Sequence, residues 1–152
     1  MNKMRRSDRE LSREEAMKVL VDGEYGILST VGADNQPYAV PLSYAVAGDT
    51  IYIHGTNQAS MRNDNMKQNP RVCFSVVGKT DVLPSQFSTN YESAVVFGTA
   101  RVSAEPEKGL LLLVDKYSPE FKAEGMKYTK AAVDKVTVIE IEIKELTGKA
   151  RR

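Results

Sequence analysis

Hydrophobic and polar residues alternate most clearly near the C-terminal end of the chain. Residues 136–144 read VTVIEIEIK. In an extended strand the three isoleucines of this segment share one face, while Glu140, Glu142 and Lys144 share the other. The pattern predicts a β-strand with one buried face and one face in water.

Further apolar runs, separated by turn residues, predict additional strands. They cover Tyr25–Thr30, Pro37–Val46, Thr50–His54, Arg71–Val77 and Ala94–Val102. Short polar turns such as Gly48-Asp49 join neighbouring runs, which is the spacing of antiparallel hairpins. About six such strands with a few helices favour a fold that is mainly β with some α, built around a small antiparallel barrel.

Two residues interrupt the predicted strands. Proline cannot donate a backbone hydrogen bond to a neighbouring strand, so Pro41 predicts that its strand lies at a sheet edge or is broken there. Gly98 lies inside the run Ala94–Val102. A glycine within a strand indicates a bulge, a bend at a barrel corner, or the close approach of a ligand.

Three segments carry helix signals. Ser12 and Glu15 have the spacing of a capping box, which predicts a helix that begins there and runs to about Val21. Pro106 suits the first turn of a second helix, which we expect to end near Tyr117. Another helical region is expected after Ser118-Pro119.

The segment His54–Pro70 is the strongest candidate for function. It reads HGTNQASMRNDNMKQNP and begins with the single histidine of the chain. A helix is expected from about Ser60 to Gln68, which places Arg62 in its first turn. A cation there opposes the helix dipole, unless an anion such as phosphate binds the free N–H groups. A solvated surface arginine explains the pattern equally well.

Composition narrows the function only slightly. We expect one domain over residues 1–152, with loose ends at 1–9 and 149–152. The net charge of +1 gives no field for nucleic acid, and no apolar run suggests a membrane span or a signal peptide, so a cytoplasmic protein is expected. The lone Cys73 is expected in the core. No cluster has metal-ligand spacing, and neither a P-loop nor a dinucleotide glycine motif is present.

An ordered set of segments resembles the pyridoxamine-5′-phosphate-oxidase-like flavoproteins, in particular the nitroimidazole-resistance branch with its nitroimidazole-reductase-like proteins. The resemblance covers about residues 5–149. It rests on Pro37–Tyr44, Ile51–Gly55, Ser60–Arg62, Asn69–Phe74, Tyr91–Gly98 and Leu146–Lys149. It implies an FMN-binding split β-barrel, Greek-key-like and antiparallel, that works as a homodimer with flavin in the cleft between subunits.

The resemblance also assigns roles to individual residues. Ser60 and Arg62 would hold the FMN phosphate, and His54 and Gly55 would lie between the phosphate and the ring. The isoalloxazine would be lined by Val40, Pro41, Leu42, Ser43 and Tyr44. Ser93 would come from the other subunit or from the cleft wall. The implied activity is an NAD(P)H-dependent oxidoreductase or flavin reductase that reduces a small electron-poor acceptor, such as a nitroaromatic compound, with His54 as the candidate catalytic residue.

Two departures from the family pattern and two alternatives remain. True pyridoxamine phosphate oxidases end with a basic substrate-binding tail, which is missing from 145–152, so pyridoxine phosphate is not the expected substrate. The loop 56–59 is one residue longer than in the resistance branch. A non-catalytic FMN-binding or flavin-sensing dimer, and a split barrel that binds haem, fit the sequence as well.

Overall fold

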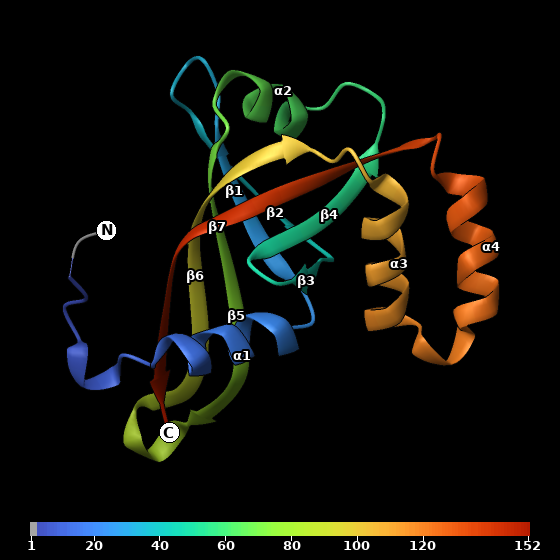
Figure 1. The fold of residues 1–152 in the computed structure, drawn as a ribbon. Helices are drawn as coiled ribbons and strands as arrows, with labels where there is room; N and C mark the ends of the chain where they lie inside the picture. Colours follow the sequence, from blue (N-terminus) through green and yellow to red (C-terminus); the bar gives the residue numbers. More distant parts are fainter. Residues whose placement is uncertain (1–2) are drawn as a thin grey trace.

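The structure, a computed structural model that describes residues 3–152, is built on one sheet of seven antiparallel strands in the order β2-β1-β5-β6-β7-β4-β3 (Figure 1). The strands are β1 Gly26–Val31, β2 Pro37–Leu42, β3 Ala45–Ala47, β4 Thr50–Thr56, β5 Arg71–Leu83, β6 Ser88–Val102 and β7 Val136–Arg151. The expected fold class, mainly β with α and antiparallel, is confirmed.

The sheet curls back toward its own edges. Strands β2 and β3 lie at opposite ends of the strand order, yet only Ser43 and Tyr44 separate them along the chain. A flat sheet could not place its two edges two residues apart, so the sheet must bend around. No ladder joins β2 to β3 within residues 3–152, and the barrel is therefore split at this seam.

In the described part of the chain, four α-helices lie around the sheet. They are α1 Arg13–Asp22, α2 Met61–Gln68, α3 Pro106–Tyr117 and α4 Lys122–Ala132, with short 3₁₀ turns at Ser7–Arg9, Pro84–Gln86 and Pro119–Phe121. Helices α3 and α4 lie side by side against one side of the sheet, with α4 outermost (Figure 1). None of the helices in the described range is long and apolar enough to cross a membrane.

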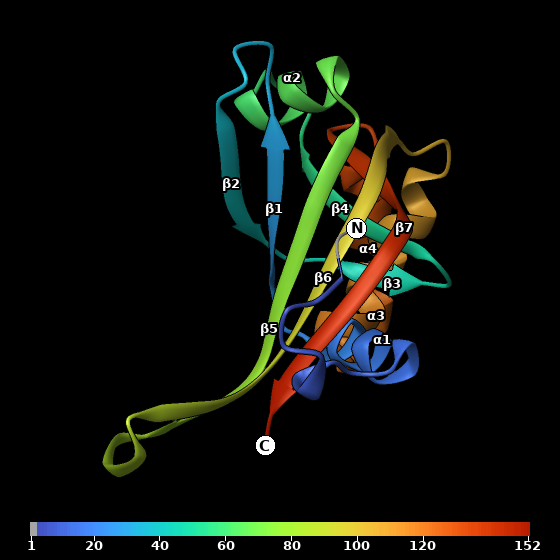
Figure 2. The ribbon, with the colours of Figure 1, turned by 90° about the vertical axis from the view of Figure 1, so that its left-hand side faces the viewer.

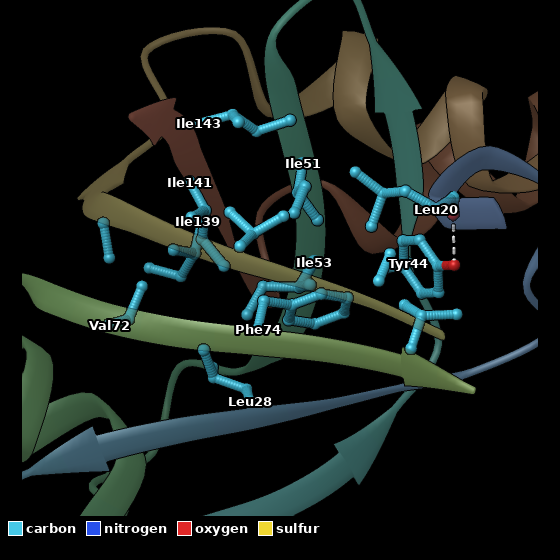
Figure 3. Packing of buried hydrophobic residues seen from close by; sticks show 14 of the residues in the cluster. Leu20, Leu28, Tyr44, Ile51, Ile53, Val72, Phe74, Ile139, Ile141 and Ile143 are labelled. Atoms are coloured by element: carbon cyan, nitrogen blue, oxygen red, sulfur yellow. Dashed lines mark hydrogen bonds between the residues drawn. The ribbon is translucent and has the colours of Figure 1, made fainter. Parts of the chain in front are cut away.

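The main core fills the inside of the curved sheet. Leu28, Phe74 and Ile141 are fully buried there, and the ring of Tyr44 packs edge-on against Phe74 with 4.9 Å between centroids. The hydroxyl of Tyr44 donates a hydrogen bond to the backbone carbonyl of Leu20 on α1 (Figure 3). This bond joins α1 to the seam between β2 and β3.

A second, smaller core lies on the other face of the sheet, beneath α3. Tyr52 and Val138 pack there against Leu110 and Leu113. Since α3 covers this face of β7, Glu140 is only 9% exposed and pairs with Arg101 at 3.4 Å. The expectation that Glu140 faces water was wrong, because alternation identifies the face inside the barrel but not a helix that covers the opposite face.

Several local predictions are confirmed. Ser12 and Glu15 form the expected capping box at the start of α1. Pro41 lies on the edge strand β2, opposite Ile27 of β1. The β6–β7 register shifts at Gly98, and a Cβ atom at this glycine would lie 2.6 Å from the carbonyl oxygen of Glu142. The bulge therefore requires glycine, as the sequence indicated.

Two long strands exceed their predicted lengths. Strand β5 continues past Val77 to Leu83, and strand β6 begins at Ser88, before Ala94. Together they form a hairpin that projects from the body of the molecule (Figure 2). The expectation of a loose end at 149–152 was wrong, because residues 149–151 pair with Tyr91–Ser93 of β6. At the other end, Ser7–Arg9 form a 3₁₀ turn, and residues 1–2 lie outside the described range.

Candidate functional site

The candidate site is centred on the first turn of α2. Ser60 is the N-cap: its backbone is extended, and its Oγ accepts a hydrogen bond of 3.2 Å from the amide of Asn63. The side-chain amide of Asn65 donates to the buried hydroxyl of Thr30 at 3.0 Å, which anchors α2 on β1. The helix is thus held firmly, with its N-terminus and its partial positive charge next to the end of β4.

The guanidinium of Arg62 lies directly over Gly55 of β4. A Cβ atom built on Gly55 would be 2.0 Å from Nη2 of Arg62 and 3.1 Å from its Cζ. Any side chain at position 55 would therefore displace the guanidinium. The family resemblance assigned Gly55 and Arg62 to one site, and the two residues are in contact in the structure.

Arg62 has no acidic partner among the residues that the structure describes. Its Nε donates to the side-chain oxygen of Asn63 at 3.2 Å, and none of the ion pairs formed within residues 3–152 includes this arginine. Partial burial lowers the pKa of its guanidinium, while the nearby Tyr38 acts in the opposite direction. A partly buried cation without a counter-charge at a helix N-terminus is a suitable site for an anion.

His54 precedes Gly55 on β4 and is influenced by the same cation. Burial, and secondly the positive charge of Arg62, lower the pKa of the His54 imidazole below its ordinary value of 6.5. The side chain is therefore neutral at physiological pH in the absence of a bound anion. A neutral imidazole can accept or donate a hydrogen bond without competing for the anion.

The segment Val40–Tyr44 forms the neighbouring wall. Val40 and Leu42 pack against the main core, whereas Pro41 and Ser43 are exposed. Tyr44 is fully buried in the core, so its ring is not available to stack on a ligand in this structure. What this segment offers at the surface is Pro41, Ser43 and backbone groups.

Tyr117 of α3 holds this wall in place, and sequence reasoning did not identify it. Its hydroxyl accepts a hydrogen bond of 3.0 Å from the amide of Tyr44 and donates to the carbonyl of Glu24 at 2.6 Å. The ammonium of Lys116 lies 3.7 Å from the centroid of the Tyr44 ring. Nothing in the sequence connects Tyr117 to Tyr44, because 73 positions separate them.

Ser93 lies far from the other candidate residues within one chain. His54 is opposite Val138 on β7, whereas Ser93 is opposite Lys149. These two β7 positions are 11 residues apart (149 − 138), or about 36 Å of strand. The hydroxyl of Ser93 faces the carbonyl of Lys149 at 3.5 Å. One chain therefore brings Ser43, His54, Gly55 and Arg62 into one region, but not Ser93.

Comparison with known proteins gives a consistent assignment. The family model described as pyridoxamine 5′-phosphate oxidase matches residues 12–150. The uncharacterized protein RA0666 of Rhizobium meliloti (strain 1021) is 32% identical over 92 residues, which cover 59% of this chain and 54% of RA0666. The chain thus spans about half the length of this curated relative.

Solved structures share the fold at low identity. A candidate 5-nitroimidazole antibiotic resistance protein from Bacteroides thetaiotaomicron VPI-5482 has a TM-score of 0.79 and 18% identity, over 93% of this chain and 86% of that one. The FAD and haem binding protein of Mycobacterium smegmatis has a TM-score of 0.79 and 22% identity, over 95% and 74%. The sequence match and the shared split-barrel fold agree, and the chain belongs to the pyridoxamine 5′-phosphate oxidase family.

Proposed function

We propose that this protein binds FMN and acts as an NAD(P)H-dependent oxidoreductase. The observation that carries the proposal is the partly buried guanidinium of Arg62, which lies over Gly55 at the N-terminus of α2 and has no carboxylate partner within residues 3–152. A phosphate would supply the missing negative charge, through charge-assisted hydrogen bonds to the guanidinium and the first-turn amides. Family membership, and a flavin-binding protein among the structural neighbours, support flavin as the phosphate-bearing group.

The remaining residues of the site fit a flavin ring next to this phosphate. Pro41 and Ser43 are exposed on the adjacent wall, and Tyr117 fixes the backbone of that wall. FMN is favoured over FAD because the site has one uncompensated arginine and the sequence has no second phosphate-binding loop. When bound, FMN would supply the redox chemistry, accepting reducing equivalents from NAD(P)H and passing them to a small electron-poor acceptor.

The position of Ser93 supports a homodimer. If Ser93 contacts the same cofactor as Arg62, it must come from a second copy of the chain, because about 36 Å of strand separate its neighbourhood from His54. The projecting β5–β6 hairpin offers a surface for such a partner, since the ring of Phe87 at its tip is 97% exposed. A C₂ arrangement, in which each copy completes the site of the other, fits these facts.

His54 is proposed to position the cofactor or the acceptor, and not to be indispensable for proton transfer. The imidazole is neutral in the free protein, so it can donate one hydrogen bond toward the ring or the acceptor. Solvent can supply the proton, because His54 is only partly desolvated and still reaches water. Replacement of His54 by alanine should therefore lower turnover by less than the ~10²-fold that marks positioned proton transfer.

The absorbance spectrum of the purified protein is the first test. The proposal predicts flavin bands, release of FMN on denaturation as identified by chromatography, and anaerobic bleaching by NADH or NADPH. Recovery of FAD alone, a Soret band with haem release, or failure to take up FMN at micromolar concentration would contradict it. A flavin that is bound but not bleached by either nucleotide would support the flavin-binding dimer without the reductase.

A further inference from the structure

The outer part of the β5–β6 hairpin stands alone, away from the body of the molecule (Figure 2). Within residues 3–152, Asp81–Leu83 pair only with Ser88–Asn90, because β7 ends at Arg151, opposite Tyr91. A two-stranded hairpin without further support is only marginally stable in water. This part of the chain therefore gains stability from contact with another surface.

The tip of the hairpin is apolar and carries no charge. Phe87 is 97% exposed and Val82 is 66% exposed. No charged residue occurs from 82 to 91, although 27% of the whole chain is charged. Phe87 also has a left-handed backbone, with a φ of 49°, which favours glycine or asparagine. A fully exposed ring in this conformation adds nothing to the packing of its own chain, so it suits contact with another molecule.

A hollow with matching properties lies between α3, α4 and the end of β4, with a volume of about 480 Å³. Leu110 and Val114 of α3 form one wall, and Phe121 and Tyr128 form the other, from the start and the middle of the α4 region. The lining includes one acidic residue, Glu124, and neither lysine nor arginine. An uncharged aromatic side chain is therefore a suitable occupant of this α3–α4 hollow.

One chain does not fill its own hollow, because the hairpin and α4 lie on opposite sides of the molecule (Figure 1). The hairpin of a second copy has the required reach. In the proposed dimer, Ser93 of one copy lies at the site of His54 and Arg62 of the other. Phe87 is six residues from Ser93 (93 − 87), or about 20 Å of strand. His54 itself lines the hollow, and the 11 residues of α4 span about 16 Å.

We propose that Phe87 of each copy in a C₂ dimer occupies the α3–α4 hollow of the other copy. This inference rests on the proposed homodimer and deepens it, because it names the contact that brings Ser93 to the flavin site of the partner. Both apolar surfaces are then covered by one reciprocal contact. Since Ser43 and His54 line the same hollow, the tip of the partner also closes this side of the flavin site.

A disulfide cross-link tests the contact directly. The full chain first receives Cys73→Ala, which removes its single thiol. Phe87→Cys and Tyr128→Cys are then introduced together, and the protein is oxidised mildly, both FMN-free and FMN-loaded, before a non-reducing gel. Each of the two substitutions alone serves as a control. A further control pairs Phe87→Cys with Val102→Cys, because Val102 is 63% exposed but lies outside the hollow.

We expect a covalent dimer from Phe87→Cys with Tyr128→Cys and monomeric chains from all three controls. A disulfide bridge requires Cα atoms within about 7 Å of each other. Failure of the first pair to cross-link would therefore overturn the proposal. Cross-linking by Phe87→Cys alone would overturn it as well, because the two tips would then contact each other.

The dissociation constant of the dimer gives a second measurement, by analytical ultracentrifugation. Phe87→Ser should raise it at least about tenfold, the value of burying one such side chain. Its circular dichroism should match that of the wild type, since the exposed ring does not support its own chain. Val102→Ser is the matched control and should leave the dissociation constant unchanged. Equal dissociation constants for Phe87→Ser and the wild type would refute the docking.

FMN uptake, measured on the same proteins, separates the two proposals. A wild type that is dimeric and binds FMN, but shows neither the cross-link nor the effect of Phe87→Ser, would refute the docking alone. The expected cross-link in a protein that takes up no FMN would support the docking and refute the flavin function. A monomeric wild type would overturn both the docking and the shared site.

Discussion

The proposed phosphate site can be tested by adding a single methyl group at Gly55, which is in contact with Arg62. A Cβ atom at position 55 would lie 2.0 Å from Nη2 of Arg62, whereas ordinary van der Waals contacts begin at about 3.4 Å. Gly55→Ala therefore forces the guanidinium to move by about 1.4 Å (3.4 − 2.0). The obstructing atom is the end of a flexible side chain, so the fold should tolerate the change. A hydrogen bond to phosphate would not survive this displacement.

The expected loss in FMN affinity equals that of removing the arginine. A hydrogen bond to a charged group contributes about 1.5–3 kcal/mol, which corresponds to a roughly 10- to 150-fold higher Kd. Titration of flavin fluorescence quenching measures it in Gly55→Ala, Arg62→Gln and the double variant. Since both substitutions remove one interaction, the double variant should bind no more weakly than Arg62→Gln. Wild-type affinity in Gly55→Ala, or additive losses, would refute this geometry.

Three further predictions concern the pKa of His54, the oligomeric state and the glycine at position 98. The single histidine allows a direct NMR titration, in which the pKa of His54 should lie below 6.5 and should rise in Arg62→Gln. Because the folded-state pKa is lowered, the contribution of His54 to stability is complete above pH 6.5 and is lost as the pH falls through the folded-state pKa. An unchanged pKa in the variant would contradict the role of Arg62. Light scattering at low micromolar concentration should give a mass near twice 16.8 kDa, whereas a stable monomer that binds FMN tightly would exclude a shared site. Gly98→Ala should lower the free energy of unfolding by about 1–3 kcal/mol in urea titrations, because its Cβ meets the backbone of Glu142, whereas Gly78→Ala, with no contact shorter than 3.4 Å, serves as the control.

Local chemistry made much of the fold predictable. The capping box of Ser12 and Glu15, the edge position of Pro41 and the bulge at Gly98 each depend on the backbone properties of one or two residues. Sequence alone reveals such properties, because they hold in almost any tertiary context.

Features that depend on distant contacts were missed. Beyond Val77, the two arms of the β5–β6 hairpin show little alternation of apolar and polar residues. They are extended because they pair with each other. Residues 149–151 are polar, apart from Ala150, and are ordered by pairing with β6. Glu140 is buried because α3 covers its face of β7. In each case the neighbour lies far away in the sequence.

The same division applies to the candidate site. His54 and Arg62 stood out as a strand end followed by the first turn of a helix, and the family resemblance added Gly55 and Ser60 to the same site. The anchoring of the opposite wall by Tyr117 could not be predicted, because it requires α3 to pack beside the β2–β3 seam.

The most direct test of the central claim compares FMN with riboflavin, which differs from it by the phosphate alone. If Arg62 and the α2 N-terminus bind the phosphate, wild-type protein should bind FMN about 10- to 150-fold more tightly than riboflavin, and Arg62→Gln should lose this preference while its riboflavin Kd stays the same. Equal Kd values for FMN and riboflavin in the wild type, or a full preference for FMN in Arg62→Gln, would show that this site does not hold the flavin phosphate.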